Sequence, residues 1–309
     1  MFAYLRLVRF PLIFTAVADS LAGYLIGLRR GTDPVEPRVV ALLVVVSATL
    51  YAVGMACNDI ADRDRDKLLH PARVLPTGAV SLRGAWTCVL ALLAVSGGAL
   101  GTLSILAPRA PEAIGIGRVG LWGAMVGMIF LYDFGGKVFA LGGPILMGLI
   151  RACNFLLGLV YSPTTLELDQ GVALFAAASF VYVMCLALAS TLEEGPPRRR
   201  LFAIAAAGML AAALGAGAIG WFVVWTFFAP AVAVTALLVA WVGFRIVDAA
   251  RLLVRARIMR LVRDGVMAII LLDASVVLWS GRLLEGGIVA ALLVPATVSL
   301  HGFAHAARR

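Results

Sequence analysis

The sequence alternates long apolar runs with short polar segments along its whole length. The runs lie at residues 7–28, 39–57, 83–106, 117–134, 139–161, 169–191, 200–222, 227–247, 264–281 and 286–303. Each is close to the roughly 20 residues that a helix needs to cross the hydrocarbon core of a bilayer. Because backbone polar groups in lipid must be satisfied within the segment, these runs are predicted to be helices. The pattern predicts an all-α polytopic membrane protein, a bundle of nine to ten transmembrane helices in which 286–303 is an extra C-terminal helix.

The composition agrees with this prediction. Of the 309 residues, 62% are hydrophobic and only 14% are charged, whereas soluble domains carry about 25% charged residues. This excludes a soluble globular protein, a disordered chain, a coiled coil and a secreted disulfide scaffold. We expect residues 1–309 to form a single transmembrane domain, and nothing in the chain indicates a nucleic-acid site.

The positive charges are distributed unevenly between the two sides that the helices would connect. The chain has 26 Lys and Arg residues, and most of them fall on the side that holds the N-terminus. Cytoplasmic loops carry an excess of Lys and Arg, so we expect the N-terminus on the cytoplasmic side of a cell (inner) membrane. The loops at 58–82, 132–138 and 193–200 lie on that side and hold most groups suited to chemistry. The basic stretch 248–263 is interpreted as an amphipathic helix at the lipid headgroups.

The most informative polar segment runs from Asn58 to Asp66, directly after the second apolar run. On a helix with about 100° per residue, three aspartates share one face with Asn58, and Asp64 points away. These three are Asp59, Asp62 and Asp66. Carboxylates this close repel each other unless a cation lies between them, and Mg²⁺ is typically held by one or two carboxylates plus substrate phosphates. The spacing favours a Mg²⁺ site for a diphosphate, and the alternative is a solvated charged loop with internal Asp–Arg pairs.

Two consecutive motifs resemble the UbiA family of intramembrane prenyltransferases. The first is NDxxDxxxD from Asn58 to Asp66, and the second is PxRxxPxGxxS from Pro71 to Ser81. Within the family, the segments YDFGGK and GPILMGLIRACNFLLG and the region 190–194 look like the EboC-like branch.

The resemblance implies a helical bundle with a central cavity and an enzyme that transfers a polyprenyl group from its diphosphate to an acceptor, often aromatic. It implies a Mg²⁺ cofactor, with the candidate metal ligands Asn58, Asp59, Asp62, Asp66, Glu193 and Glu194. The candidate diphosphate-binding residues are Arg9, Arg73, Tyr132, Lys137, Arg151 and Arg198. The candidate catalytic residues are Asp59, Asp62, Asp66 and Lys137. The other expected partner is membrane lipid, and the acceptor and the oligomeric state are left open.

The second acidic motif departs from the family pattern. The family carries DxxxD after its sixth helix, whereas this chain has Glu193 and Glu194 there and no Asp. Adjacent residues on a helix diverge by about 100°, so only one of them readily joins a shared site, and a second Mg²⁺ is left open. Either the arginines at 198–200 partly replace it, or they only end the helix with cytoplasmic positive charge. A faint repeat aligns 51–62 with 182–193 and suggests two motifs facing one substrate.

Four polar residues lie inside apolar runs, namely Asp19, Arg151, Asn154 and Asp273. Such groups are costly in a membrane and normally face a cavity or a partner. Arg151 is interpreted as pointing into the substrate cavity, where it would meet the diphosphate or a carboxylate. The alternative is a structural pair with Asp19 or Asp273, and for Asp273 structural pairing is favoured.

A second class of function stays open at this point. A flippase, a transporter or a degenerate family member that binds a prenyl lipid without reacting would also place polar groups in a helical bundle. The position of the acidic motif at the membrane surface argues against this class, and the missing second Asp motif argues for it. Release of diphosphate would distinguish the two.

Overall fold

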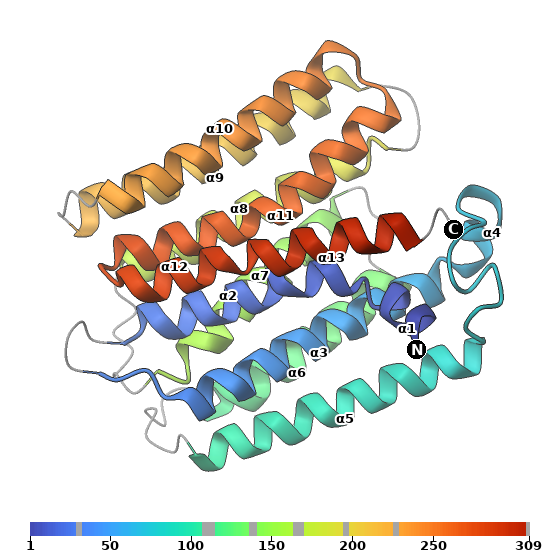
Figure 1. Ribbon diagram of the computed structural model, residues 1–309, viewed down its shortest axis with the longest axis horizontal. Coiled ribbons are helices and arrows are strands. Elements are labelled where there is room, and N and C mark those ends of the chain that lie inside the picture. The colour runs from blue at the N-terminus through green and yellow to red at the C-terminus, as the bar shows by residue number, and fades with distance from the viewer. Residues whose placement is uncertain are drawn as a thin grey trace.

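The computed structural model describes residues 1–28, 33–106, 115–135, 141–162, 170–193, 198–224 and 229–306. This part of the chain is helical and contains no strand, and its long helices run side by side in one bundle (Figure 1). The helices are α1 Phe2–Leu7, a 3₁₀-helix Phe10–Leu12, α2 Ile13–Ile26, α3 Pro37–Ala61, α4 Arg63–Leu69, α5 Leu82–Leu106, α6 Gly115–Phe134, α7 Gly142–Leu159, α8 Gln170–Ser190, α9 Arg199–Val224, α10 Ala229–Arg251, α11 Arg255–Trp279, α12 Leu283–Ala291 and α13 Leu293–Ala306. The predicted all-α bundle is confirmed.

Seven helical segments of the described residues are long and apolar enough to cross a membrane. They are α3, α5, α7, α10, most of α8 and α9, and α12 together with α13. The apolar helices α2, α6 and α11 run beside them in Figure 1, so the predicted number of nine to ten spans fits approximately. The chain is an integral, multi-pass membrane protein.

Helix α11 lies in the core of the bundle and packs against α2, α8, α9, α10 and α12. Its residues from Met267 to Trp279 are all buried. Helix α2 in turn packs against α3 and α7. Figure 1 shows α5 at one edge of the bundle and α9 and α10 at the opposite edge. The elements α2, α3, α6 and α7 therefore meet away from that α9–α10 edge, and they surround the cavity described below.

Helices α2 and α7 approach each other closely at two glycines. A Cβ atom on Gly158 would lie 1.8 Å from the carbonyl oxygen of Ser20, and a Cβ on Gly23 would lie 1.8 Å from that of Phe155. Only glycine allows this separation, as is common where membrane helices pack through small residues. The contact sets the distance between the polar residues that these two helices share.

We expect Gly158→Ala to destabilise the protein by about 1–3 kcal/mol or more, because the added methyl group must push α2 and α7 apart. The measurement is the thermal unfolding midpoint in detergent. The matched control is Gly101→Ala on α5, where an added Cβ meets no atom within 4 Å and should be neutral or stabilising. Equal midpoints for the two variants would contradict the close packing.

Two predicted elements need correction. The first run is not one helix, because Arg9 adopts the left-handed conformation (φ 47°, ψ 52°) and Pro11 follows it at the start of the 3₁₀-helix; proline is suited to the beginning of a helix and not to its interior. The stretch 248–263 is not a separate amphipathic helix. It is divided between α10 and α11 by a turn at 252–254, and Asp248 pairs with Arg257 (3.1 Å) across that turn.

Candidate active site

The predicted acidic motif lies where α3 meets α4, at the end of the bundle that also holds α1 (Figure 1). Asn58 and Asp59 belong to the last turn of α3, Asp62 lies between the helices, and Asp66 belongs to α4. The expected single helix through the motif is therefore wrong, since α3 ends at Ala61. Asp is a weak helix former, and the ion pairs described next hold the second half of the motif in its own helix.

Two buried carboxylates and two half-buried guanidinium groups form one cluster at this point. Nη1 of Arg73 lies 2.5 Å from Oδ2 of Asp66 and 3.6 Å from Oδ1 of Asp59. Nη2 of Arg9 donates a hydrogen bond of 3.3 Å to the same Oδ1 of Asp59. Asp59 is 5% exposed and Asp66 is 2% exposed. We call these four residues the Asp–Arg cluster. Buried charges need such partners, and the unusual backbone of Arg9 places its side chain here.

Asp64 is on the outside of the motif, as its spacing predicts. It is exposed and its Oδ1 lies 2.7 Å from Nζ of Lys67 and 3.5 Å from Nε of Arg63. Its hydrogen bond with Lys67 lowers the pKa of its carboxyl below the usual value. The motif thus contains two buried carboxylates, the half-buried Asp62 and the exposed Asp64, which makes Asp64 a matched control for substitutions of the others.

Glu193 lies in the turn that follows α8 and is half-buried. Burial raises the pKa of its carboxyl. The charges of Arg255, Arg9 and Arg73 oppose this rise, so Glu193 lies within electrostatic range of both arginines of the cluster. The second acidic element therefore lies near the first. Of the other predicted residues, Glu194 and Lys137 lie outside the described residues, and Arg198 is exposed before α9.

A cavity with about 580 Å³ of empty space, part of it open to the outside, lies between α2, α3, α6 and α7. Its wall is mostly apolar, with Ala16, Leu50, Gly54, Met55, Met125, Ile129, Met147 and Ile150. Met55 is one helical turn before Asp59 on α3, so the cavity begins next to the Asp–Arg cluster. Tyr132, also in the cavity wall, lies within electrostatic range of Arg9 and Asp62. The implied central cavity is thus present, and its apolar wall is suited to an isoprenoid tail.

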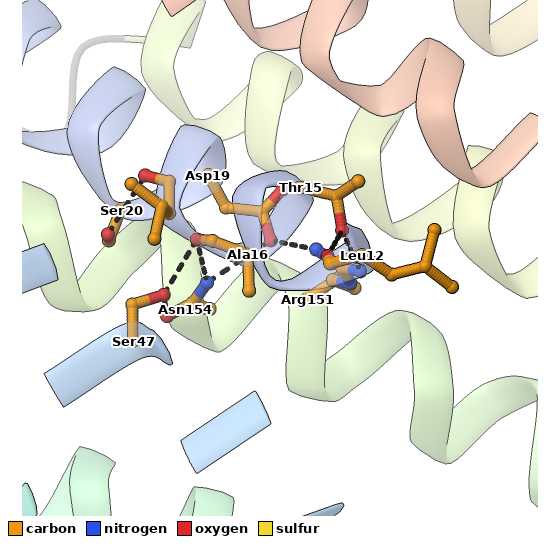
Figure 2. A network of polar contacts seen from close by, with 9 residues as sticks. Leu12, Thr15, Ala16, Asp19, Ser20, Ser47, Arg151 and Asn154 are labelled. Carbon is orange, nitrogen blue, oxygen red and sulfur yellow. Dashed lines mark hydrogen bonds and ion pairs between the residues drawn. The ribbon is translucent and has the colours of Figure 1, made fainter. Parts of the chain in front are cut away.

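Three of the four polar residues predicted inside the membrane, namely Asp19, Arg151 and Asn154, belong to a network between α2 and α7 (Figure 2). Nη1 of Arg151 donates to Oδ2 of Asp19 at 2.7 Å, and Nη2 donates to Oγ1 of Thr15 at 2.8 Å. Nδ2 of Asn154 donates to Asp19 and to the carbonyl oxygen of Ala16 at 3.1 and 2.7 Å. Figure 2 shows these side chains pointing toward one another from the two helices.

Both interpretations of Arg151, cavity lining and pairing with an aspartate, hold in the structure. It pairs with Asp19, and it also forms part of the cavity wall. Its guanidinium lies 5.7 Å from the ring of Tyr51. Tyr51 precedes Asp59 by about 12 Å along α3 at 1.5 Å per residue. Arg151 is thus paired with Asp19, while Tyr51 lies within electrostatic range of both Arg151 and Arg9 of the Asp–Arg cluster.

The donor groups of the cluster are those that Mg²⁺ takes. Asp59 and Asp66 supply carboxylate oxygens, and Asn58 and Asp62 lie beside them in the chain. Among the described residues, no three His, Cys, Asp or Glu side chains are gathered around one metal position, since Arg73 lies between the two buried carboxylates. Mg²⁺ commonly uses only one or two carboxylates and completes its shell with water and substrate phosphates. The cluster therefore fits Mg²⁺ together with a diphosphate.

Sequence reasoning missed part of the cavity wall. Ser47, Tyr51 and Met55 line the cavity, and with Asn58 they follow a helical spacing of three or four residues along α3. The spacing could have indicated these residues, because residues three or four apart lie on the same face of a helix. A helix face that ends in a polar motif is a candidate to line the same site.

The fold is that of UbiA homologues. A UbiA homologue from Aeropyrum pernix K1 matches with a TM-score of 0.63 at 20% identity, over 86% of this chain and 97% of that one. A UbiA homologue from Archaeoglobus fulgidus bound to GPP and Mg²⁺ matches with a TM-score of 0.58 at 16% identity, over 88% and 99%. The resemblance seen in the sequence motifs is confirmed at the level of the fold.

Sequence relatives match over shorter segments. A digeranylgeranylglyceryl phosphate synthase from Metallosphaera sedula is 36% identical over 92 residues, which are 30% of this chain and 31% of that one. The synthase of the same name from Methanoculleus marisnigri is 35% identical over 102 residues, 33% and 34% of the two chains. The matches thus span about a third of these relatives. No family model matches the chain.

Proposed function

We propose that this chain is a member of the UbiA family and an intramembrane prenyltransferase that moves a polyprenyl group from its diphosphate to an acceptor. The observation that carries the proposal is the Asp–Arg cluster beside the apolar cavity. A cluster of acids and arginines suits Mg²⁺ and a diphosphate, and the adjacent cavity suits the apolar tail. Structural neighbours bound to GPP and Mg²⁺ or to DMAPP and Mg²⁺ support it. They give less support to a flippase or transporter.

The acidic residues would hold Mg²⁺, which when bound neutralises charge on the diphosphate leaving group. The proposed ligands are Asn58, Asp59, Asp62, Asp66, Glu193 and Glu194. Arg9 and Arg73 already lie among the buried carboxylates, and we propose that they turn to the diphosphate when it binds. Cations placed where leaving-group charge develops stabilise the transition state.

The remaining residues complete the proposed site. The diphosphate would be bound from its other sides by Tyr132, Lys137 and Arg198. The positive charge of Lys137 would also stabilise the leaving group during the reaction. The apolar wall of the cavity would hold the tail and keep water away from the allylic carbon. We also propose that residues 1–309 form a single transmembrane domain, in a cell (inner) membrane with this site on the cytoplasmic side. The excess of Lys and Arg on that side supports the orientation.

The test is diphosphate release by the purified protein in lipid, with a panel of allylic diphosphates and membrane-lipid extract. We expect release to need Mg²⁺ and to fall to background when EDTA removes it, because the leaving-group charge is then not neutralised. Mg²⁺ should restore release more fully than Ca²⁺, which prefers six to eight ligands in a larger, more flexible shell. The mass of the product identifies the acceptor. Release that is unaffected by EDTA would contradict the proposal.

A further inference from the structure

The cavity wall contains a single carboxylate among the described residues that form it. This residue is Asp133, in the last turn of α6, and it is 6% exposed. It lies within electrostatic range of Cys57 on α3, two residues before Asp59, and of its neighbour Tyr132. Asp133 is therefore at the end of the cavity that adjoins the Asp–Arg cluster. This is where the allylic carbon would lie if the diphosphate bound the cluster and the tail entered the cavity.

Prenyl transfer to a protic acceptor leaves a proton that some group must take. Among the polar residues of the cavity wall, Arg151 is already protonated and bound to Asp19, and the phenols Tyr51 and Tyr132 hold their own protons at neutral pH. Ser47 and Asn154 are not basic. Asp133 is the group in the wall with the chemistry to accept the proton.

We propose that Asp133 is the proton acceptor for the second substrate, an inference that rests on the proposed prenyl transfer. The C–O bond between the allylic carbon and the diphosphate breaks, and the diphosphate leaves with the bonding electrons. The acceptor atom forms a new bond to the allylic carbon, and its proton passes to the carboxylate of Asp133. A base in this position selects the chemical class of the acceptor, which is a neutral protic group such as an alcohol or a phenol. An acceptor that reacts through a carboxylate or phosphate oxygen would need no base.

The experiment compares the fate of the prenyl group in wild type, Asp133→Asn and Asp133→Glu. Purified protein in lipid receives geranylgeranyl diphosphate with Mg²⁺ and one of three acceptors. These are a monoalkyl glyceryl phosphate, an alkylphenol and a total membrane-lipid extract. Diphosphate, alkylated product and free prenyl alcohol are measured separately. Asp64→Asn serves as the matched control, because it neutralises an exposed carboxylate of the neighbouring motif.

We expect Asp133→Asn to lose about 10²-fold in alkylated product, to retain Mg²⁺-dependent diphosphate release, and to divert the prenyl group to its alcohol by reaction with water. Asp133→Glu should recover part of the alkylation, because it keeps a carboxylate. Undiminished alkylation by Asp133→Asn would overturn the assignment, and so would equal loss of alkylation and diphosphate release, which indicates a role in the donor site or in folding. Alkylation of none of the acceptors by wild type would overturn the protic class. Absence of diphosphate release by wild type would instead reject the proposed function itself.

Discussion

Replacing Asp59 with Asn is expected to slow Mg²⁺-dependent diphosphate release by about 10²-fold or more. Oδ1 of Asp59 is the atom that Arg9 and Arg73 share, at 3.3 and 3.6 Å. Asn keeps the shape of the side chain and one oxygen but removes the charge. The substitution therefore weakens the proposed metal site and releases both arginines from their common partner. Metal-ion stabilisation of leaving-group charge contributes several kcal/mol, and each 1.36 kcal/mol is a factor of ten in rate.

The measurement is the rate of diphosphate release as a function of Mg²⁺ concentration. A ligand of the metal should shift the curve to higher Mg²⁺ and lower its plateau. Asp64→Asn is the control in the same motif, because Asp64 is exposed and pairs only locally with Lys67 and Arg63. We expect this control to stay within about twofold of wild type, since exposed ion pairs contribute little. Equal loss in the two variants would mean that the net charge of the motif, and not the Asp–Arg cluster, controls diphosphate release.

The helices were predictable because a bilayer leaves the chain few alternatives. Backbone groups in lipid must bond within their own segment, so the run at 83–106 appears as α5 with nearly the same bounds. The exceptions are places where local chemistry overrides the apolar pattern. Pro11 and the left-handed Arg9 divide the first run, and the turn at 252–254 separates α10 from α11.

The types of residue in the candidate site could be predicted from the sequence, whereas the ion pairs between them could be predicted only in part. The motif spacing brought Asp59 and Asp66 to one place, as the structure confirms. That Arg73 joins them depends on the path of the loop after α4, where its amide donates to the carbonyl oxygen of His70 at 3.0 Å. Sequence spacing does not specify such a path. By contrast, the pairing of Arg151 with Asp19 was one of two stated alternatives, because a charge in a membrane needs a partner.

The Asp19–Arg151 pair leads to the second large expected effect, which concerns stability. Arg151 and Asp19 are 7% and 0% exposed and lie on different helices. Asp273 of α11 is also buried and lies within electrostatic range of Asp19 and Arg151. The ion pair between the Arg151 guanidinium and the Asp19 carboxylate joins α7 to α2. Removal of the cation would leave an uncompensated negative charge inside the bundle.

Arg151→Met should therefore lower the free energy of unfolding by about 3–5 kcal/mol, the cost of breaking a buried pair by removing one partner. The double variant Arg151→Met with Asp19→Asn should recover much of this loss, because it removes the stranded charge as well. Thermal unfolding in detergent measures both, and the coupling follows from a double-mutant cycle. Arg199→Met, which replaces an exposed arginine at the start of α9, is the control and should change little. If the double variant were as unstable as the sum of its single variants, the pair would not be the source of stability, and Arg151 would instead be retained for its place in the cavity wall.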